Sequence, residues 1–256
     1  MIKLAFYGKG GIGKSTAASN VSVALAQKGL KVMQIGCDPK ADSTINLLGG
    51  EPVMPVMNYL REHDDEPESI EEISKEGYGG VLCIETGGPT PGLGCAGRGI
   101  IAALEELEKK GAYEKYQPDV VIYDVLGDVV CGGFSMPMRK GYADKVFIIT
   151  SGESMSVYAA ANIAMAVENF KSRGYASLGG FILNKRNVKN EEEKAAELAA
   201  DFHSSVIAEI DRSDLVSEAE DMRKTVMEAF PDSTAAEQYR ALADKIAELC
   251  GMGEEK

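Results

Sequence analysis

One stretch of the chain decides its fold, and it reads Gly8-Lys9-Gly10-Gly11-Ile12-Gly13-Lys14-Ser15. It matches the phosphate-binding pattern G-x-x-x-x-G-K-S/T, with an apolar β-like run before it and a helical pattern after it. Such glycines let backbone N–H groups converge on phosphate oxygens, and the following helix presents its positive end to them. The pattern therefore predicts a nucleotide site in which Lys14 neutralises phosphates and Ser15 binds Mg²⁺.

Apolar runs rich in β-branched residues recur outward from this loop, with helical patterns between most of them. Strands are expected at residues 2–7, 31–35, 81–84, 120–123, 146–150 and 178–183. Helices are expected at residues 15–27, 99–109, 154–170, 191–202 and 235–248, the last two at the periphery. The alternation predicts an α/β fold, a single P-loop NTPase domain over residues 1–256 with a largely parallel sheet and helices on both faces. Ligands of such sheets bind at the carboxyl ends of the strands.

The overall composition of the chain limits the functions that it can have. A formal charge of −13 argues against binding to nucleic acid or to anionic lipid. No run approaches the length of a membrane span, and the chain starts directly with a strand pattern, so we expect a cytoplasmic protein. The cysteines are five, an odd number, and widely spaced, which predicts reduced thiols rather than disulfides.

An acidic, proline-punctuated insert lies at about residues 51–78. Its sequence His63-Asp64-Asp65-Glu66-Pro67-Glu68 predicts a solvated helix and loop. Contact with a partner protein is the alternative role for this insert.

Carboxylates follow two predicted strands. Asp124 comes directly after the run Val120-Val121-Ile122-Tyr123, in the position of a carboxylate that approaches Mg²⁺ beside Ser15. Asp128 follows after Gly127 and could orient or deprotonate the attacking water. Asp38 follows another strand and could also approach Mg²⁺ or that water. For Asp38, Asp42 and Asp128 the alternative is a turn or helix-capping role.

Two further features concern assembly and metal. A second lysine, Lys9, inside the phosphate loop is typical of P-loop ATPases that work as face-to-face dimers, although a solvated loop lysine is the alternative.

Cys95 and Cys131 lie in glycine-rich loops, which allow close backbone approach to a bulky ligand. A [4Fe-4S] cluster needs four thiolates, which two such cysteines from each of two chains would supply. From spacing alone, two inert thiols remain the alternative. Cys37 and Cys83 are expected to be small buried side chains.

Four blocks carry a resemblance to a known family: residues 8–16, 36–44, 94–99 and 123–137. They resemble the nitrogenase iron protein and its close relatives, the ATP-dependent reductase subunits of dark-operative protochlorophyllide reductase and of the methanogen nickel-tetrapyrrole cyclase. The resemblance covers nearly the whole chain. It implies an ATP-hydrolysing reductase, a homodimer with one bridging [4Fe-4S] cluster that passes electrons to a catalytic heteromer after receiving them from a ferredoxin or flavodoxin.

The resemblance also implies roles for individual residues. Gly8, Gly10, Gly11, Ile12, Gly13, Lys14, Ser15 and Thr16 would bind MgATP, with Lys9 acting on the nucleotide of the other subunit. Asp38 and Asp42 would lie in the first nucleotide-sensing loop, and Asp124 and Asp128 in the hydrolytic site. Cys95 and Cys131 would bind the cluster, Arg98 would lie on the docking face where some relatives are ADP-ribosylated, and Asn184 would contact adenine.

Three departures from the family pattern concern the partner. The sequence stops soon after the helix at residues 239–250, where nitrogenase iron proteins usually continue, and Ile45 stands where nitrogenase members commonly carry arginine. The insert matches no familiar version. These departures favour a nitrogenase-like partner over nitrogenase itself.

Two other functions compete with the reductase. One is a spatial organiser like the partitioning and septum-positioning ATPases, which share the lysine-bearing loop and dimerise on ATP but lack the loops of Cys95 and Cys131. The other is an iron–sulfur assembly scaffold of the related P-loop class, in which the bridging cysteines normally form a C-x₂-C pair that is missing here.

Overall fold

The computed structural model describes residues 1–63, 66–88, 96–127, 135–139, 141–171 and 174–252. Their strands form one eight-stranded sheet in the order β3-β4-β2-β5-β1-β6-β7-β8, parallel throughout except for β3, which runs antiparallel to β4. The strands are β1 (Ile2–Tyr7), β2 (Val32–Cys37), β3 (Ser74–Glu76), β4 (Leu82–Glu85), β5 (Val120–Val125), β6 (Lys145–Thr150), β7 (Ser177–Asn184) and β8 (Val206–Ile210). The predicted parallel sheet is confirmed.

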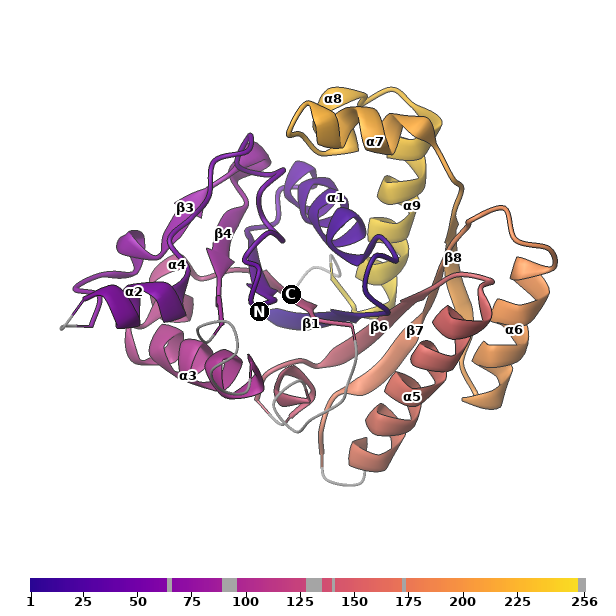
Figure 1. Cartoon of the computed structure of the whole chain (residues 1–256), viewed down its shortest axis with the longest axis horizontal. Coiled ribbons are helices and arrows are strands. Elements are labelled where there is room, and N and C mark those ends of the chain that lie inside the picture. The colour runs from indigo at the N-terminus through magenta and orange to yellow at the C-terminus, as the bar shows by residue number, and fades with distance from the viewer. Residues whose placement is uncertain (64–65, 89–95, 128–134, 140, 172–173, 253–256) are drawn as a thin grey trace.

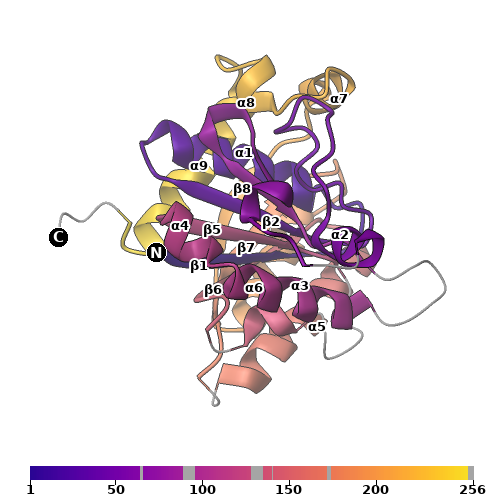
Figure 2. The ribbon, with the colours of Figure 1, turned by 90° about the vertical axis from the view of Figure 1, so that its left-hand side faces the viewer.

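Helices cover both faces of this sheet, as Figures 1 and 2 show. One face carries α1 (Lys14–Gln27), α7 (Asp214–Asp221), α8 (Val226–Ala229) and α9 (Thr234–Leu249). The other carries α2 (Val56–Glu62), α3 (Ala96–Lys109), α4 (Ala112–Tyr116), α5 (Ser154–Lys171) and α6 (Glu191–Asp201). The α/β fold class is therefore confirmed.

Strand β1 shows why the strands read as unbroken apolar runs. Its Leu4 and Phe6 belong to the core beneath α1 and α9, whereas Ala5 and Tyr7 belong to the core beneath α3 and α5. A parallel strand covered on both faces must be apolar at every position, not at alternate ones.

The acidic insert is more ordered than the predicted solvated helix and loop. It contains α2, two 3₁₀ turns (Ile70–Glu72 and Tyr78–Gly80) and the edge strand β3. Val56, Ile70 and Ile73 are fully buried against the main core. These apolar residues join the insert to the sheet, while the charged residues of its described part stay at the surface.

Helix α9 also differs from expectation, because it is not peripheral. It packs against α1 and β8 and buries one continuous face. That face consists of Ala235, Ala236, Tyr239, Leu242, Ala243, Ile246 and Ala247. The spacing is that of an amphipathic helix, and the small alanines allow close approach to α1.

No described helix is both long enough and apolar enough to cross a membrane. The strand order places β1 centrally, with β5 and β6 as its neighbours. The phosphate loop at the carboxyl end of β1 therefore lies beside the ends of β5 and β6, where the ligand of an open parallel sheet is expected.

Candidate functional site

The phosphate loop occupies the turn from β1 into α1, and Lys14 is the first residue of that helix. Gly13 precedes it with a φ of 91°, in the left-handed region that glycine adopts without strain. A Cβ atom at Gly13 would lie 2.4 Å from Asn184 Nδ2. Both the turn and the close approach of Asn184 therefore require glycine at this position.

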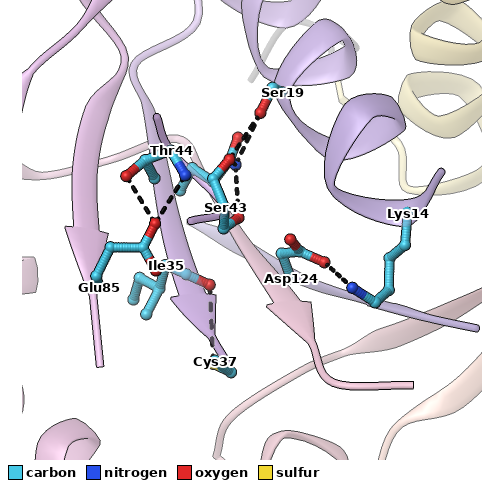
Figure 3. Close-up of polar contacts among 9 residues, drawn as sticks. Lys14, Ser19, Ile35, Cys37, Ser43, Thr44, Glu85 and Asp124 are labelled. Atoms are coloured by element: carbon cyan, nitrogen blue, oxygen red, sulfur yellow. Dashed lines mark hydrogen bonds and ion pairs between the residues drawn. The ribbon is translucent and has the colours of Figure 1, made fainter. Parts of the chain in front are cut away.

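A buried ion pair joins the loop to β5. Figure 3 shows Lys14 Nζ directed at the Asp124 carboxylate. The distance from Lys14 Nζ to Asp124 Oδ1 is 2.8 Å, and the two residues are 8% and 2% exposed. An unpartnered charge would be costly at this depth, so the two side chains depend on each other for a partner. The predicted nearness of Asp124 to the phosphate loop is thus present in the structure.

The chain just beyond β5 lies directly against the phosphate loop. A Cβ atom at Gly127 would lie 2.2 Å from Gly8 O and 2.7 Å from Gly10 N, which leaves no room for a side chain. The path of the chain from Asp124 toward Cys131 therefore begins in backbone contact with the loop.

A cavity of about 420 Å³ opens on one side of the loop. Asn184, at the end of β7, lines it and donates from Nδ2 to Ile12 O at 2.6 Å. Arg186 donates to Gly11 O at 2.8 Å, so two side chains hold the loop from this side. The remaining wall, which sequence patterns did not identify, comes from β8, α7 and α9. It includes Asp211, Arg212, Ser213, Asp214, Ser217 and Tyr239. A polar cavity of this size beside the loop can accept the base and sugar of a nucleotide.

A second cavity of about 360 Å³ shares Ser15 and Thr16 with the first. Ser15 and Thr16 line it together with Asp42, which is exposed. Asp38 lies earlier in the same segment, where its Oδ1 accepts a hydrogen bond from Lys40 N at 2.9 Å. The structure therefore places Asp42 and the Mg²⁺ candidate Ser15 on the wall of one cavity, and it gives Asp38 a turn-forming contact.

The other predicted site residues lie as follows. Lys9 is half-buried in the loop and pairs with no described carboxylate. Arg98 is exposed in the first turn of α3. Asp128, Cys95 and Cys131 lie outside the described residues.

The three described cysteines offer no competing metal site. Cys37 and Cys83 are buried, as expected, and burial is the main reason that the pKa of each thiol is raised. Burial likewise raises the pKa of Cys250, to about 11. Thiolates are the form that binds iron. Within the described ranges, no cluster of three or more His, Cys, Asp or Glu residues could hold a metal ion. The other two of the five cysteines, Cys95 and Cys131, lie outside the described residues.

The elements that follow these two cysteines lie together. Helix α3 starts at Ala96, and the 3₁₀ turn Met136–Met138 comes shortly after Cys131. The two elements pack against each other and share one buried core cluster. The chain therefore brings the segments after both cysteines into one region.

Together, the central phosphate loop, its buried Lys14–Asp124 pair and the strand order define a P-loop nucleotide-binding protein. Within this class, the chain belongs to the NifH/frxC family of 4Fe-4S iron sulfur cluster binding proteins, whose model matches residues 2–251. The resemblance noted in the sequence is confirmed at the level of the family.

A relative and two solved structures illustrate the likeness. The chain is 50% identical over 248 residues to the nitrogenase iron protein of Methanospirillum hungatei, covering 96% of this chain and 88% of that one. The cell division ATPase MinD of Pyrococcus furiosus superposes with a TM-score of 0.75 at 17% identity, over 97% and 99% of the two chains. MinD of Pyrococcus horikoshii, solved with Mg-ADP, gives 0.74 at 18%, over 100% and 99%. The two structures show a shared fold.

Proposed function

We propose that this protein is an ATP-dependent electron-transfer reductase. Two copies form a homodimer that holds one [4Fe-4S] cluster and delivers electrons to a nitrogenase or nitrogenase-like catalytic heteromer. A ferredoxin or flavodoxin supplies the electrons. Family membership over residues 2–251 supports this class of activity.

One contact carries the proposal, that of Gly127 with the backbone of Gly8 and Gly10. The segment that starts at this contact continues through Asp128 to Cys131. One short stretch of chain therefore runs from the phosphate loop to a proposed cluster ligand. A change in the loop on nucleotide binding would move this stretch, which couples ATP to the redox site.

The buried ion pair prepares the site for MgATP. Lys14 and Asp124 satisfy each other at 2.8 Å, and MgATP brings a partner of the right charge for each. Lys14 would neutralise the phosphates, Asp124 and the hydroxyl of Ser15 would hold Mg²⁺, and Asp128 would orient the attacking water. Asn184 contacts the adenine, and Lys9 reaches the nucleotide of the partner subunit. The Mg-ADP of the Pyrococcus horikoshii relative supports this use of the fold.

Cys95 and Cys131 of each protomer would hold the cluster. The raised thiol pKa values of Cys37, Cys83 and Cys250 make those residues poorer ligands. When bound, the cluster supplies a one-electron redox couple. Glycines flank both cysteines in the sequence, and backbone N–H groups close to a cluster can donate to its sulfides.

Two observations bear on the catalytic partner in opposite directions. The 50% identical relative is named a nitrogenase iron protein, which favours nitrogenase. Ile45, where nitrogenase members commonly carry arginine, favours a nitrogenase-like enzyme. We therefore propose a pseudo-two-fold heteromer of this general class, which docks on the face that carries Arg98.

Iron and sulfide analysis of anaerobically purified protein tests the proposal. We expect a brown dimer with about four irons, because one cubane uses four thiolates. Cys95→Ser and Cys131→Ser should abolish iron binding, and the matched controls Cys37→Ser and Cys83→Ala should retain it. Four irons per protomer would reject the bridging arrangement. A colourless, iron-free protein that still dimerises on ATP would favour the spatial-organiser alternative.

The partner is tested by adding reduced protein and MgATP to a purified nitrogenase catalytic component and, separately, to the component encoded nearest to its gene. Sustained ammonia formation with the first would identify nitrogenase. Electron transfer to the second alone would identify a nitrogenase-like enzyme, and transfer to neither would reject the docking proposal.

A further inference from the structure

Glu85 carries a buried carboxyl group that the proposed function does not use. It is the last residue of β4 and is 1% exposed. Figure 3 shows that its Oε1 accepts hydrogen bonds from Thr44 N and from Thr44 Oγ1. Each of these hydrogen bonds is 2.7 Å long. Its Oε2 is buried with no hydrogen-bond partner among the described residues. Because it is costly to leave a buried polar group without its partner, these two hydrogen bonds tie Glu85 to Thr44.

The neighbouring strand makes room for this acid. A Cβ atom at Gly36, which pairs with Glu85 across β2 and β4, would lie 1.9 Å from Glu85 Oε2 and 2.7 Å from Ser43 Cβ. Any larger residue would displace either the acid or Ser43. The absence of a side chain at Gly36 is thus required by the Glu85–Thr44 contact.

A second buried side chain holds the residue next to Thr44. Gln34 Nε2 donates to Ser43 O at 3.2 Å and to Ser43 Oγ at 3.0 Å. Ser19 of α1 also donates to Ser43 O, at 3.1 Å. Buried hydrogen bonds therefore hold the carboxyl end of the segment Asp38–Thr44. Asp42, in contrast, is exposed in the cavity that Ser15 also lines.

The residues that follow Glu85 touch the same segment and one more element. A Cβ atom at Gly88 would lie 2.5 Å from Pro39 Cβ, so Gly88 packs on the start of the segment. Helix α2 holds the other side, because Met57 N donates to Thr86 O at 3.0 Å and Arg61 donates to Gly88 O. Residues 85–88 thus connect the segment Asp38–Thr44 to α2.

We propose that Glu85 is a positioning residue that ties the nucleotide-facing segment Asp38–Thr44 to residues 86–88 and, through them, to α2. A nucleotide that moves Asp42 then moves α2 as well, because the two are held by one short rigid connection. This inference rests on MgATP binding at the phosphate loop. It assigns α2, on the surface of the insert, as an element that responds to the nucleotide.

Hydrogen–deuterium exchange of the full-length protein with and without MgATP tests the proposal. In the wild type, MgATP should change the exchange of residues 38–44 and 56–62 together. Thr44→Val deletes the hydroxyl donor, and Glu85→Leu deletes both acceptors. Each should bind MgATP within about threefold of the wild type and keep the change at 38–44, but lose at least half of the change at 56–62. Glu85→Gln keeps an acceptor oxygen and should retain the wild-type response.

Tyr113→Phe is the matched control, because it removes a buried hydrogen bond, to Tyr123 at 3.1 Å, that does not involve this segment. It should leave the response of residues 56–62 unchanged. If Glu85→Leu does not fold, Thr44→Val alone decides. A wild-type protein that binds MgATP without any change at 56–62, or a full response in Thr44→Val, would overturn the inference alone. A wild type that does not bind MgATP would overturn both the inference and the proposed function.

Discussion

At the scale of single residues, the site is dominated by the buried pair of Lys14 and Asp124. We expect Lys14→Ala to abolish MgATP binding and also to lower the free energy of unfolding by about 3 kcal/mol, because it leaves Asp124 charged, buried and unpaired. The double variant Lys14→Ala/Asp124→Asn should recover part of that stability without recovering binding. Chemical denaturation followed by circular dichroism measures both. Equal stability of the single and double variants would show that the pair is not coupled.

Glu85 makes stability depend on pH in a predictable direction. Burial is the largest cause that raises the pKa of its carboxyl from 4.5 to about 8, against the lowering effect of the Thr44 hydrogen bonds. Between these two values the unfolded chain releases the proton while the folded protein keeps it. The folded state therefore loses stability as the pH rises through this window, at up to about 1.4 kcal/mol per pH unit, and the loss is complete above the folded pKa.

Glu85→Gln cannot ionise and isolates this effect. We expect the unfolding free energy of the wild type, relative to that of Glu85→Gln, to be highest near pH 5 and to fall toward pH 8. Urea titrations of both proteins at several pH values measure the difference. A constant difference would mean that the carboxyl titrates at its ordinary pKa.

At the scale of elements, the most demanding junction is the contact between the exit of β5 and the phosphate loop. Gly127→Ala would place a methyl group 2.2 Å from Gly8 O, and the strain should cost about 1–3 kcal/mol and weaken MgATP binding. Gly10→Ala is the control for stability, since a Cβ atom there meets no atom within 4 Å. Thermal unfolding should separate the two variants by several degrees. Equal melting temperatures would indicate that the two segments move apart easily.

The elements also show how far sequence patterns reach. Six strands were predictable because each is dominated by apolar residues that are mostly buried. Strand β3 was not, because Ser74-Lys75-Glu76 lies at an edge and owes its conformation to pairing with β4. Strand β8 was missed because it is only partly buried and mixes alanine and glutamate with β-branched residues. The residues of helix α9 were predicted but its burial was not, since an amphipathic pattern does not reveal which element covers its apolar face.

The candidate site, too, was only partly predictable from the sequence. The phosphate loop and Asp124 followed from a motif with strict local geometry. Glu85 was missed, although it ends an apolar strand run as Asp124 does, and the same strand-end rule would have found it. The cavity wall at residues 211–217 carries no local motif, because tertiary packing alone brings β8 and α7 to the loop.

At the scale of the whole molecule, docking should depend on charge at the carboxyl ends of the strands. Arg98 is exposed in the first turn of α3, at that edge of the sheet. Arg98→Glu should weaken electron delivery to the catalytic partner by tenfold or more, on the order of 1.4 kcal/mol or above, while MgATP binding by the isolated dimer stays unchanged. Stopped-flow measurement of electron transfer checks the first and equilibrium binding the second.

Lys31→Glu provides the control for Arg98→Glu. Lys31 is exposed just before β2, at the opposite edge of the sheet, and its reversal changes the net charge by the same amount. It should leave electron delivery unchanged. An equal loss in both variants would mean that overall charge, not a local contact, governs docking.

The short edge strand β3 has a consequence for behaviour at high concentration. It offers only three residues to an incoming strand, two of them the charged and exposed Lys75 and Glu76. Unpaired strand edges are the usual starting points of aggregation, and short, charged edges resist it. This side of the sheet is therefore blocked against growth by strand addition, so crowded copies of the chain are kept from joining into extended β-structure along it.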